Sequence, residues 1–490
     1  MKLPTLMNMG KCQRLLFLSI LVCYLGTTAI YSIVPRHDRG TLLHPLKSFL
    51  GGSRPNTEPQ TPHEGLGHLA KYNLTPTFEY SRRTIQTKYF EGPRSTLTVL
   101  DKTNLFGDWQ TLSLEVDDLS YVALEPELPP LTLHVPSSPE VDTSIISFGI
   151  ATNVQRLPDA IPQLKHWLPH TESSLHILVP PSDKIPTLQK QMNDLGINTS
   201  IKESPLEFAK SYFALVKELY EKRTPDTKWL VLIDDDTFVP SLAALLTRLN
   251  KAYDPSDELL IAAMSDNMKQ IQIFGLLPYG GGGVFISVPL AAKLVEPKVW
   301  DACMEIPDNQ GDQIVAECLR QHSAVRPTFD PGLNQMDISG GGDVAAGYYE
   351  SGRQMLTVHH WRSPQRWYDI DTPTVSYVSK ACGDEGVLMR WLFKGDIVLS
   401  NGYSIAEYPN GIEITELEKI EHTWPEELSK FEHRIGPLRK KMNSDDKRTL
   451  KMVDTEILEG YGVRQTYLEQ EETEQPTRRN DRVLELLWEL

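Results

Sequence analysis

The sequence predicts an α/β fold, in which a mostly parallel sheet carries helices on both faces. Short apolar runs typical of buried strands occur at residues 144–151, 175–179, 198–202 and 229–233. Segments with the apolar spacing of a helix separate these runs, at residues 160–167, 186–195 and 206–222. Strands that alternate with helices in this way form parallel sheets covered on both faces. We therefore expect ligands to bind outside the carboxyl ends of the strands.

Chain length and net charge restrict the possible functions. At 490 residues the chain is too long for one simple core, which predicts two or three folded units with tails. The net charge is −16 at pH 7, and no basic stripe interleaved with aromatic residues offsets it. These features argue against a nucleic-acid partner.

An apolar segment near the N-terminus, residues 15–34, contains no charged residue and is long enough to cross a bilayer as a helix. Three basic residues precede it, which predicts that residues 1–14 form a cytoplasmic tail, although two arginines on the other side weaken the asymmetry. A cleaved signal peptide is the alternative. Because the run is longer than a usual signal-peptide core and no clear cleavage site follows, we expect an uncleaved anchor with everything after Arg36 in the lumen.

Composition divides the rest of the chain into four segments. Residues 35–62 are rich in Pro, Gly, Ser, His and Thr and are typical of a flexible stem. Short β-leaning pieces predict a small accessory β region and linker at residues 63–142. The α/β unit is expected at residues 143–411. Residues 412–490 are charged and helix-prone, which predicts a charged C-terminal extension.

Cysteines and glycosylation sequons agree with a lumenal location. An oxidising compartment allows a disulfide, and Cys303 with Cys318 is the expected pair. Cys382 is then left over as a buried, small apolar residue. The sequons at Asn73 and Asn198 fit the same side of the membrane, although such triplets are common by chance.

Three consecutive aspartates, Asp234, Asp235 and Asp236, follow the last of the apolar runs. Like charges held together raise one another's pKa, so the cluster is costly by itself. A divalent cation offsets that cost, because Mg²⁺ and Mn²⁺ prefer carboxylate oxygens with substrate phosphates completing the shell. The alternative is a turn that caps a helix beginning near Ser241, for which one aspartate would suffice.

Further segments contain residues that suit a site, each with a plainer alternative. Four glycines at 280–283 allow backbone to approach a ligand closely, or form a loop without function. Asp312 begins an expected helix, where it either acts chemically or complements the helix dipole. Arg156 follows the first strand, where it either meets a diphosphate or is a solvated surface residue.

Two adjacent histidines, His359 and His360, follow a short apolar strand. Adjacent side chains on a strand face opposite sides, so we expect at most one of the two to point into a site. Imidazole is an acceptable partner for Mn²⁺ beside carboxylates. A lone histidine is more often a packed or surface residue.

Taken in order, these segments resemble the Fringe-like inverting β-1,3-glycosyltransferases, including plant and fungal Fringe-related Golgi proteins. IDDDTFV and GGGGVFIS stand where that family has an Asp triplet and a GGAG-like segment, with Gly282 in the place of alanine. The family then has an acidic pair, a helix and a cysteine six residues after the second acid. Asp312 and Cys318 keep this spacing, but Gly311 replaces the first acid. The histidine in TVHHW that matches best is His359, and the resemblance covers roughly residues 144–411.

The resemblance implies a GT-A fold with a Rossmann-like sheet, and transfer of a sugar from a UDP-sugar to a glycan or glycoprotein hydroxyl in the Golgi. Asp312 is the expected base that takes the proton of the acceptor. Because Gly311 removes a neighbouring charge, burial would have to raise the pKa of Asp312. The remaining expected residues are metal ligands for Mn²⁺ or Mg²⁺ (Asp236, Asp234, His359), residues for the nucleotide sugar (Asp234, Asp235, Arg156, Gly281, Gly282) and a stacking residue for a sugar (Trp361).

Two other functions are consistent with parts of the sequence. A metal-dependent hydrolase or phosphatase would use clustered aspartates, but no convincing supporting lysine is present and the glycine and histidine segments would stay unexplained. A non-catalytic, lectin-like or scaffolding Golgi membrane protein with a degenerate glycosyltransferase fold is the second alternative. The missing acid at Gly311 and the histidine pair keep it open.

Overall fold

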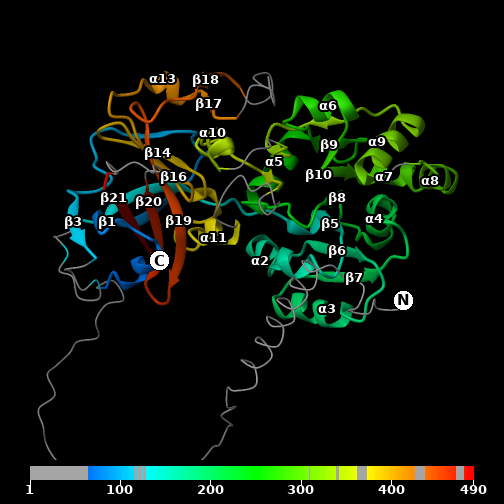
Figure 1. The fold of residues 1–490 in the computed structure, drawn as a ribbon. Coiled ribbons are helices and arrows are strands. Elements are labelled where there is room, and N and C mark those ends of the chain that lie inside the picture. Colours follow the sequence, from blue (N-terminus) through cyan, green and yellow to red (C-terminus); the bar gives the residue numbers. More distant parts are fainter. Residues whose placement is uncertain are drawn as a thin grey trace, which may run out of the picture. The chain divides into compact units, whose positions relative to one another are not determined.

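The computed structural model describes residues 65–114, 119, 124, 128–307, 310–337, 342–360, 372–424, 436–470 and 479–490. All of them belong to one compact unit, which extends from Thr61 to Leu490 (Figure 1). The predicted cytoplasmic tail, anchor and stem lie outside the described residues, as does Trp361. Among the described helices, none has both the length and the apolar character that crossing a bilayer requires.

One sheet of the described chain has seven strands in the order β11-β9-β10-β8-β5-β6-β7. Its strands are β5 (Ile146–Ala151), β6 (Ser174–Val179), β7 (Thr199–Glu203), β8 (Trp229–Ile233), β9 (Leu260–Ala263), β10 (Tyr279–Ser287) and β11 (Thr328–Phe329). All neighbours pair in parallel except β10, which runs antiparallel to β8 and β9. The predicted α/β arrangement with a mostly parallel sheet is therefore confirmed, and β10 is its antiparallel member.

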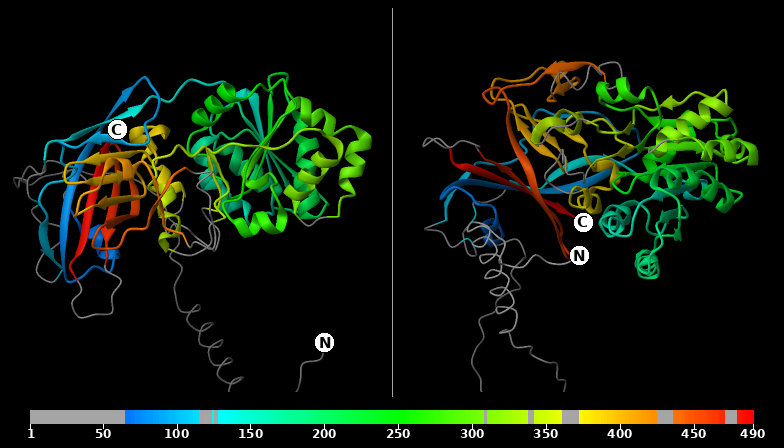
Figure 2. Two further views of the ribbon diagram at one scale, coloured as in Figure 1. Left: turned by 90° about the horizontal axis from the view of Figure 1, so that it is seen from above. Right: turned by 45° about the vertical axis from the view of Figure 1, so that its right-hand side comes forward.

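Helices cover both faces of this sheet (Figure 2, left). Strand β8 is apolar throughout because both of its faces are buried. Trp229 and Val231 pack in one core, and Leu230 and Leu232 pack in another. The helices of the described chain are α2 (Leu157–Trp167), α3 (Ile185–Asp194), α4 (Phe208–Lys222), α5 (Leu242–Ala252), α6 (Met268–Phe274), α7 (Val288–Leu294), α8 (Pro297–Met304), α9 (Gly311–His322), α10 (Ala346–Tyr349), α11 (Thr372–Ser376), α12 (Ser379–Cys382) and α13 (Ile414–Leu417). Residues from α4, α7 and α9 share the core of Leu230, and residues from α2 and α5 share the core of Trp229.

A second sheet contains ten strands of the described chain, in the order β2-β14-β15-β16-β19-β20-β21-β1-β3, with β4 paired to β1. The strands are β1 (Thr77–Phe90), β2 (Thr98–Leu100), β3 (Gln110–Ser113), β4 (Leu131–Pro136), β14 (Arg390–Phe393), β15 (Ile397–Ser400), β16 (Ser404–Glu407), β19 (Arg448–Leu458), β20 (Gly462–Glu469) and β21 (Asp481–Glu489). Two short parallel pairs lie outside it, β12 (Leu333–Asn334) with β13 (Thr357–Val358), and β17 (Ile420–His422) with β18 (Leu438–Lys440).

The expectation of a helix-prone C-terminal extension is wrong for the described residues after 411, where long strands dominate. Strand β21 pairs in parallel with β1, which comes from the predicted accessory region, so one sheet joins the two segments. The charges that suggested a solvated helix have partners across the sheet. Glu485 of β21 is fully buried and accepts a hydrogen bond from the Tyr80 hydroxyl at 2.6 Å. Burial alone would raise the pKa of Glu485, but His68 and two nearby arginines hold it at about 2.

The cysteines follow the prediction. A disulfide joins Cys303 of α8 to Cys318 of α9. Cys382 is unpaired and buried within the described chain, and burial raises the pKa of its thiol to about 12. The disulfide ties α8 to the helix that begins next to Asp312.

Candidate active site

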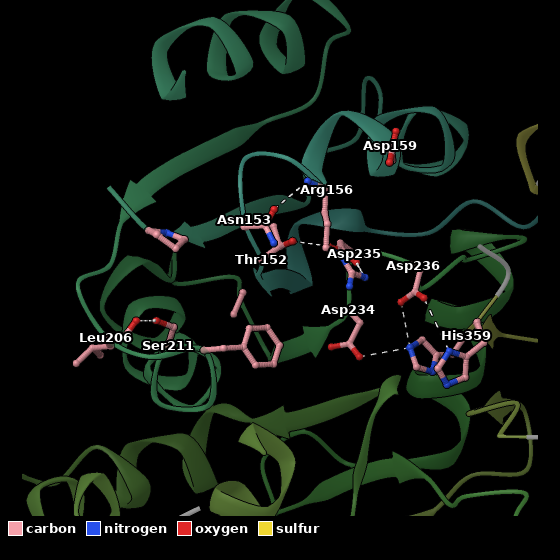
Figure 3. A pocket seen from close by; sticks show the side chains of 14 residues that line it. Thr152, Asn153, Arg156, Asp159, Leu206, Ser211, Asp234, Asp235, Asp236 and His359 are labelled. Carbon is pink, nitrogen blue, oxygen red and sulfur yellow. Dashed lines mark hydrogen bonds and ion pairs between the residues drawn. The ribbon is translucent and has the colours of Figure 1, made fainter. Parts of the chain in front are cut away.

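A cavity of about 830 Å³ opens at the carboxyl ends of β5 and β8 (Figure 3). Parallel strands end at one edge of their sheet, so segments far apart in the sequence meet there. The loop after β5 contributes Thr152 and Arg156, and the loop after β8 contributes the three aspartates. The other described residues that line the cavity are Ala151, Asn153, Asp159, Pro180, Leu206, Phe208, Ser211, His359 and His360.

Asp235 is engaged by the protein itself. The Arg156 Nε–H donates to Asp235 Oδ2 at 2.8 Å, a second guanidinium nitrogen donates to Oδ1, and the Thr152 hydroxyl donates to Oδ2. The Asp235 side chain is only 7% exposed. A bidentate pair of this kind fixes the plane of the guanidinium. Asp235 thus holds Arg156 at the cavity wall, and within the described part of the chain the remaining N–H groups of Arg156 are available to a ligand.

The outer two aspartates face His359. The His359 Nε2 atom lies 3.1 Å from Asp236 Oδ1 and 3.3 Å from Asp234 Oδ2 (Figure 3). Its Nδ1 atom lies 3.2 Å from the Gln335 carbonyl oxygen, which can only accept, so Nδ1 carries the hydrogen. In neutral His359, Nε2 therefore presents a lone pair towards the same space as the two carboxylates.

The charges of these groups are strongly coupled. Burial alone would raise the pKa of Asp236, but the charges of His359, His360 and Arg156 hold it below its ordinary value. Burial alone would lower the pKa of His359, but Asp236 and Asp234 raise it well above its ordinary value. Without another cation, the two carboxylates thus favour a proton on His359.

His360 corrects the expectation that only one histidine can point into the site. Strand β13 ends at Val358, and His360 has a φ of +57°, so the alternation of a strand does not extend to it. The two imidazole rings lie 3.7 Å apart between centroids. His360 Nδ1 lies 3.9 Å from Asp236 Oδ2, and its Nε2 lies 3.2 Å from Asp337 Oδ1. Asp337 has no signal in the sequence, whereas His360 was visible as half of the pair.

The donor set fits a divalent cation. Ligand atoms of Asp236, His359 and His360 all lie within 4.8 Å of one another, and Asp234 is next to His359. An octahedral ion with bonds of about 2.1 Å places neighbouring ligand atoms about 3 Å apart, which matches the shorter of these separations. Carboxylate oxygen with imidazole nitrogen suits first-row divalent ions. The capping alternative is not needed, because the Ser241 side chain caps α5 by accepting from the Ala244 amide at 3.1 Å.

The glycine run has a different role from the one expected. A Cβ on Gly281 would lie 2.1 Å from the His359 ring, and one on Gly282 would lie 2.2 Å from the Ala263 Cβ. Neither glycine is among the described residues that line the cavity. The missing side chains make room for protein atoms rather than for a ligand. The backbone is also tied to the triplet, since the Thr237 hydroxyl donates to the Gly281 carbonyl at 2.7 Å and accepts from the Asp234 amide at 2.9 Å.

Asp312 lies outside the lining of this cavity, in the first turn of α9. Its carboxylate accepts from the Gln313 amide at 2.8 Å and from the Gly280 amide at 3.4 Å. Burial, followed by the charge of Asp234, raises its pKa to about 6. Burial thus raises the pKa of Asp312 in the absence of a neighbouring acid at position 311.

Gly311 itself leaves no room for an acid. A Cβ at this position would lie 2.4 Å from the Tyr212 Cβ of α4. The Tyr212 ring therefore takes the place in which the first acid of the resembled family would begin. The departure from the family pattern is thus a change of packing between α4 and α9.

No protein-family model matches the sequence, and no curated protein matches it. Similar solved structures include the apo form of mouse xyloside xylosyltransferase 1, with a TM-score of 0.31 and 11% identity over 45% of this chain and 98% of that one. The apo-form glycosyltransferase GlyE of Streptococcus pneumoniae TIGR4 has a TM-score of 0.31 and 14% identity over 46% of this chain and 56% of that one. A glycosyltransferase involved in glycosylation of the major capsid of PBCV-1 has a TM-score of 0.28 and 17% identity over 45% of this chain and 94% of that one.

Proposed function

We propose that this protein is a metal-dependent inverting glycosyltransferase, which moves a sugar from a UDP-sugar to a hydroxyl group of a glycan or glycoprotein. The observation that carries the proposal is the convergence of Arg156, Asp234, Asp236, His359 and His360 on one cavity at the carboxyl ends of β5 and β8. A fixed guanidinium beside carboxylate and imidazole ligands suits a diphosphate that is bound together with a cation. A cavity of about 830 Å³ is large enough for a nucleotide sugar.

Each side chain has a distinct part in binding the donor. Asp234, Asp236, His359 and His360 would hold Mn²⁺ or Mg²⁺, which when bound supplies positive charge that stabilises a diphosphate leaving group. Arg156 donates its free N–H groups to a phosphate oxygen. Phe208, which lines the cavity with 57% of its surface exposed, offers an apolar face to the uracil base.

The transfer step needs one base. The acceptor oxygen forms a bond to the anomeric carbon while the bond from that carbon to the diphosphate oxygen breaks, and UDP leaves with the electron pair. Attack from the face opposite the diphosphate inverts the anomeric carbon. The proton of the acceptor hydroxyl passes to Asp312, whose pKa of about 6 lets it be ionised at neutral pH and still accept a proton.

The finer features of the proposal rest on the sequence. We place the catalytic unit in the Golgi lumen as part of a single-pass type II membrane protein, because of the apolar segment at 15–34. We propose a β-1,3 linkage from the resemblance to the Fringe-like enzymes. The acceptor is a glycan or glycoprotein in that compartment.

A second candidate function is a non-catalytic, lectin-like or scaffolding protein. The observation that favours it is Gly311, which replaces one acid of the pair that the resembled family has beside the base. Such a protein would bind sugar without releasing UDP. Release of UDP or free sugar from a UDP-sugar in the presence of Mn²⁺ separates the two functions.

The proposal is tested by titrating the full-length chain with UDP in a calorimeter, with and without Mn²⁺. We expect binding that depends on Mn²⁺ and that Asp236→Ala abolishes. Asp194→Ala is the matched control, because Asp194 is exposed and pairs with Lys190 on the surface of α3. Equal UDP binding by Asp236→Ala and the wild type would overturn the proposal.

A further inference from the structure

A second cavity, of about 660 Å³, has no part in the donor binding described above. One wall is the loop 274–278, which starts at the last residue of α6 and leads to β10. The other is the surface of α9 that carries Gln313, Ala316 and Arg320. Residues 325–327, which follow α9, close one side.

Asp312 is hydrogen-bonded to the chain next to both walls of this cavity. The loop wall leads directly into Gly280, whose amide donates to Asp312 Oδ2 at 3.4 Å. The helix wall begins at Gln313, whose amide donates to Asp312 Oδ1 at 2.8 Å. Ala316 and Leu319 follow Asp312 by four and seven residues, so all three lie on one face of α9. Asp312 is not itself among the described residues that line this cavity, but it precedes Gln313, which is.

Asp312 is also electrostatically close to the first cavity, which is lined by Arg156 and the three aspartates and is called the donor cavity below. After burial, the charge of Asp234 makes the next largest contribution to its raised pKa. Asp234 lines the first cavity, whereas Gln313, the neighbour of Asp312, lines the second. Asp312 thus feels the charge of a residue that lines the first cavity and is adjacent in sequence to a residue that lines the second, as suits a base that connects a donor with an acceptor.

The walls of the second cavity differ in chemistry from those of the first. Most of the described residues that line the second cavity are of apolar type, and one of them, Leu276, has 64% of its surface exposed. Arg320 and Glu317 form a bidentate ion pair, and Arg326 is the other charged residue among the described lining residues. Exposed apolar side chains around a hollow favour a ligand that brings apolar surface of its own. The apolar residues that line this cavity include Phe274, Leu276, Leu277, Pro278, Pro307 and Pro327.

We propose that this second cavity, the acceptor cavity, binds the acceptor, and that the acceptor is a glycoside with an apolar aglycone. The aglycone packs against the loop 274–278 and α9, while a hydroxyl of its sugar reaches Asp312. This inference rests on the proposed function, because it assigns the substrate class of the same transfer. An apolar aglycone explains why mostly apolar residues line the cavity next to the proposed base.

The test compares matched phenyl and methyl β-glycosides of galactose, glucose and N-acetylglucosamine. Their binding to the full-length chain is measured by ligand-observed NMR titration without nucleotide. For at least one sugar we expect the phenyl glycoside to bind at least tenfold more tightly than its methyl partner. Ala316→Trp, which fills the acceptor cavity, should remove that difference, and Leu276→Ser should weaken it.

Two controls separate an effect on glycoside binding from an effect on folding. Ala252→Trp introduces the same side chain at the exposed end of α5 and should leave glycoside binding unchanged. Calorimetry with UDP and Mn²⁺ should give the same affinity for Ala316→Trp as for the wild type, which shows that the variant is folded. Leu276→Ser changes a side chain that is already exposed, so its effect is on binding rather than on folding.

The two proposals fail in different ways. Equal affinities for all phenyl and methyl pairs, or a preference for phenyl that Ala316→Trp and Leu276→Ser leave intact, would overturn the acceptor cavity while UDP binding stands. Absence of Mn²⁺-dependent UDP binding would overturn the proposed function, even if the phenyl glycosides bind as expected.

Discussion

A methyl group on Gly281 would lie 2.1 Å from the imidazole of His359. Gly281 belongs to β10, whereas His359 follows β13, so two segments far apart in the sequence share one small space. The ring in that space approaches Asp236 to 3.1 Å and Asp234 to 3.3 Å. The glycine thus determines where the histidine of the candidate metal site can lie.

Gly281→Ala should weaken Mn²⁺-dependent UDP binding at least tenfold, because the new Cβ displaces His359 from the two carboxylates. Calorimetry with UDP and Mn²⁺ measures the effect. Gly107→Ala is the control, since a Cβ there would make only an ordinary contact, 3.6 Å from Leu128. Wild-type affinity in Gly281→Ala would show that His359 has no part in the site.

Asp312→Asn should lower kcat by roughly 10²- to 10⁴-fold, the usual contribution of a general base. UDP binding with Mn²⁺ should stay at the wild-type level, because Asp312 is not in the lining of the donor cavity. In the wild type, kcat should rise with pH up to about 6 and then level off, since only ionised Asp312 accepts a proton. Loss of UDP binding in Asp312→Asn would assign the residue to the donor site instead.

The Asp312 carboxyl should also contribute to the pH dependence of the free energy of unfolding. Burial raises its pKa from 3.8 to about 6 in the folded chain, so between these two pH values the folded state binds more protons than the unfolded state. The contribution of Asp312 to the free energy of unfolding is therefore fully present below pH 3.8 and is lost as the pH rises through about 6. Urea denaturation at several pH values measures it. Asp312→Asn should remove this part of the slope, and an unchanged slope would show that the residue is not buried as described.

Gly311→Asp, which restores the acidic pair of the resembled family, should destabilise the protein by about 1–3 kcal/mol, because overpacking costs that much. The cause is the Cβ, which would lie 2.4 Å from the Tyr212 Cβ. Gly311→Ala should therefore destabilise as well, although Gly→Ala at a compatible helix position is usually stabilising. Thermal unfolding of both variants measures the effect, and a raised Tm for Gly311→Ala would contradict the packing argument.

Local patterns were sufficient for the α/β part from residue 144 to residue 233. The predicted strand at 229–233 is β8, and the predicted helix at 206–222 is α4 at Phe208–Lys222. These elements are buried against layers on one or both sides. The spacing of apolar residues along each segment therefore indicates which positions are buried. The same logic placed the aspartate triplet and Arg156 at one edge of the sheet, where the structure brings them together.

The C-terminal strands could not be predicted in this way. Their charges, such as that of Glu485, suggest a solvated surface until the partners from β1 and from residue 68 are known. Those partners are more than 400 residues away, since Glu485 is 405 residues from Tyr80 and 417 from His68. Burial of a charge depends on such pairing, which no local pattern records.

By itself, the sequence determined the order of strands and helices from residue 144 to residue 233, the pair Cys303–Cys318, and the meeting of Arg156 with the aspartate triplet at one edge of the sheet. Only the tertiary structure decided which atoms share one space. It turned His360 towards Asp236 through a left-handed backbone, brought Asp337 beside it, and filled the room above Gly281 with His359. The physical reason is that burial periodicity acts over a few residues, whereas steric fit and charge pairing act between segments that only folding brings together.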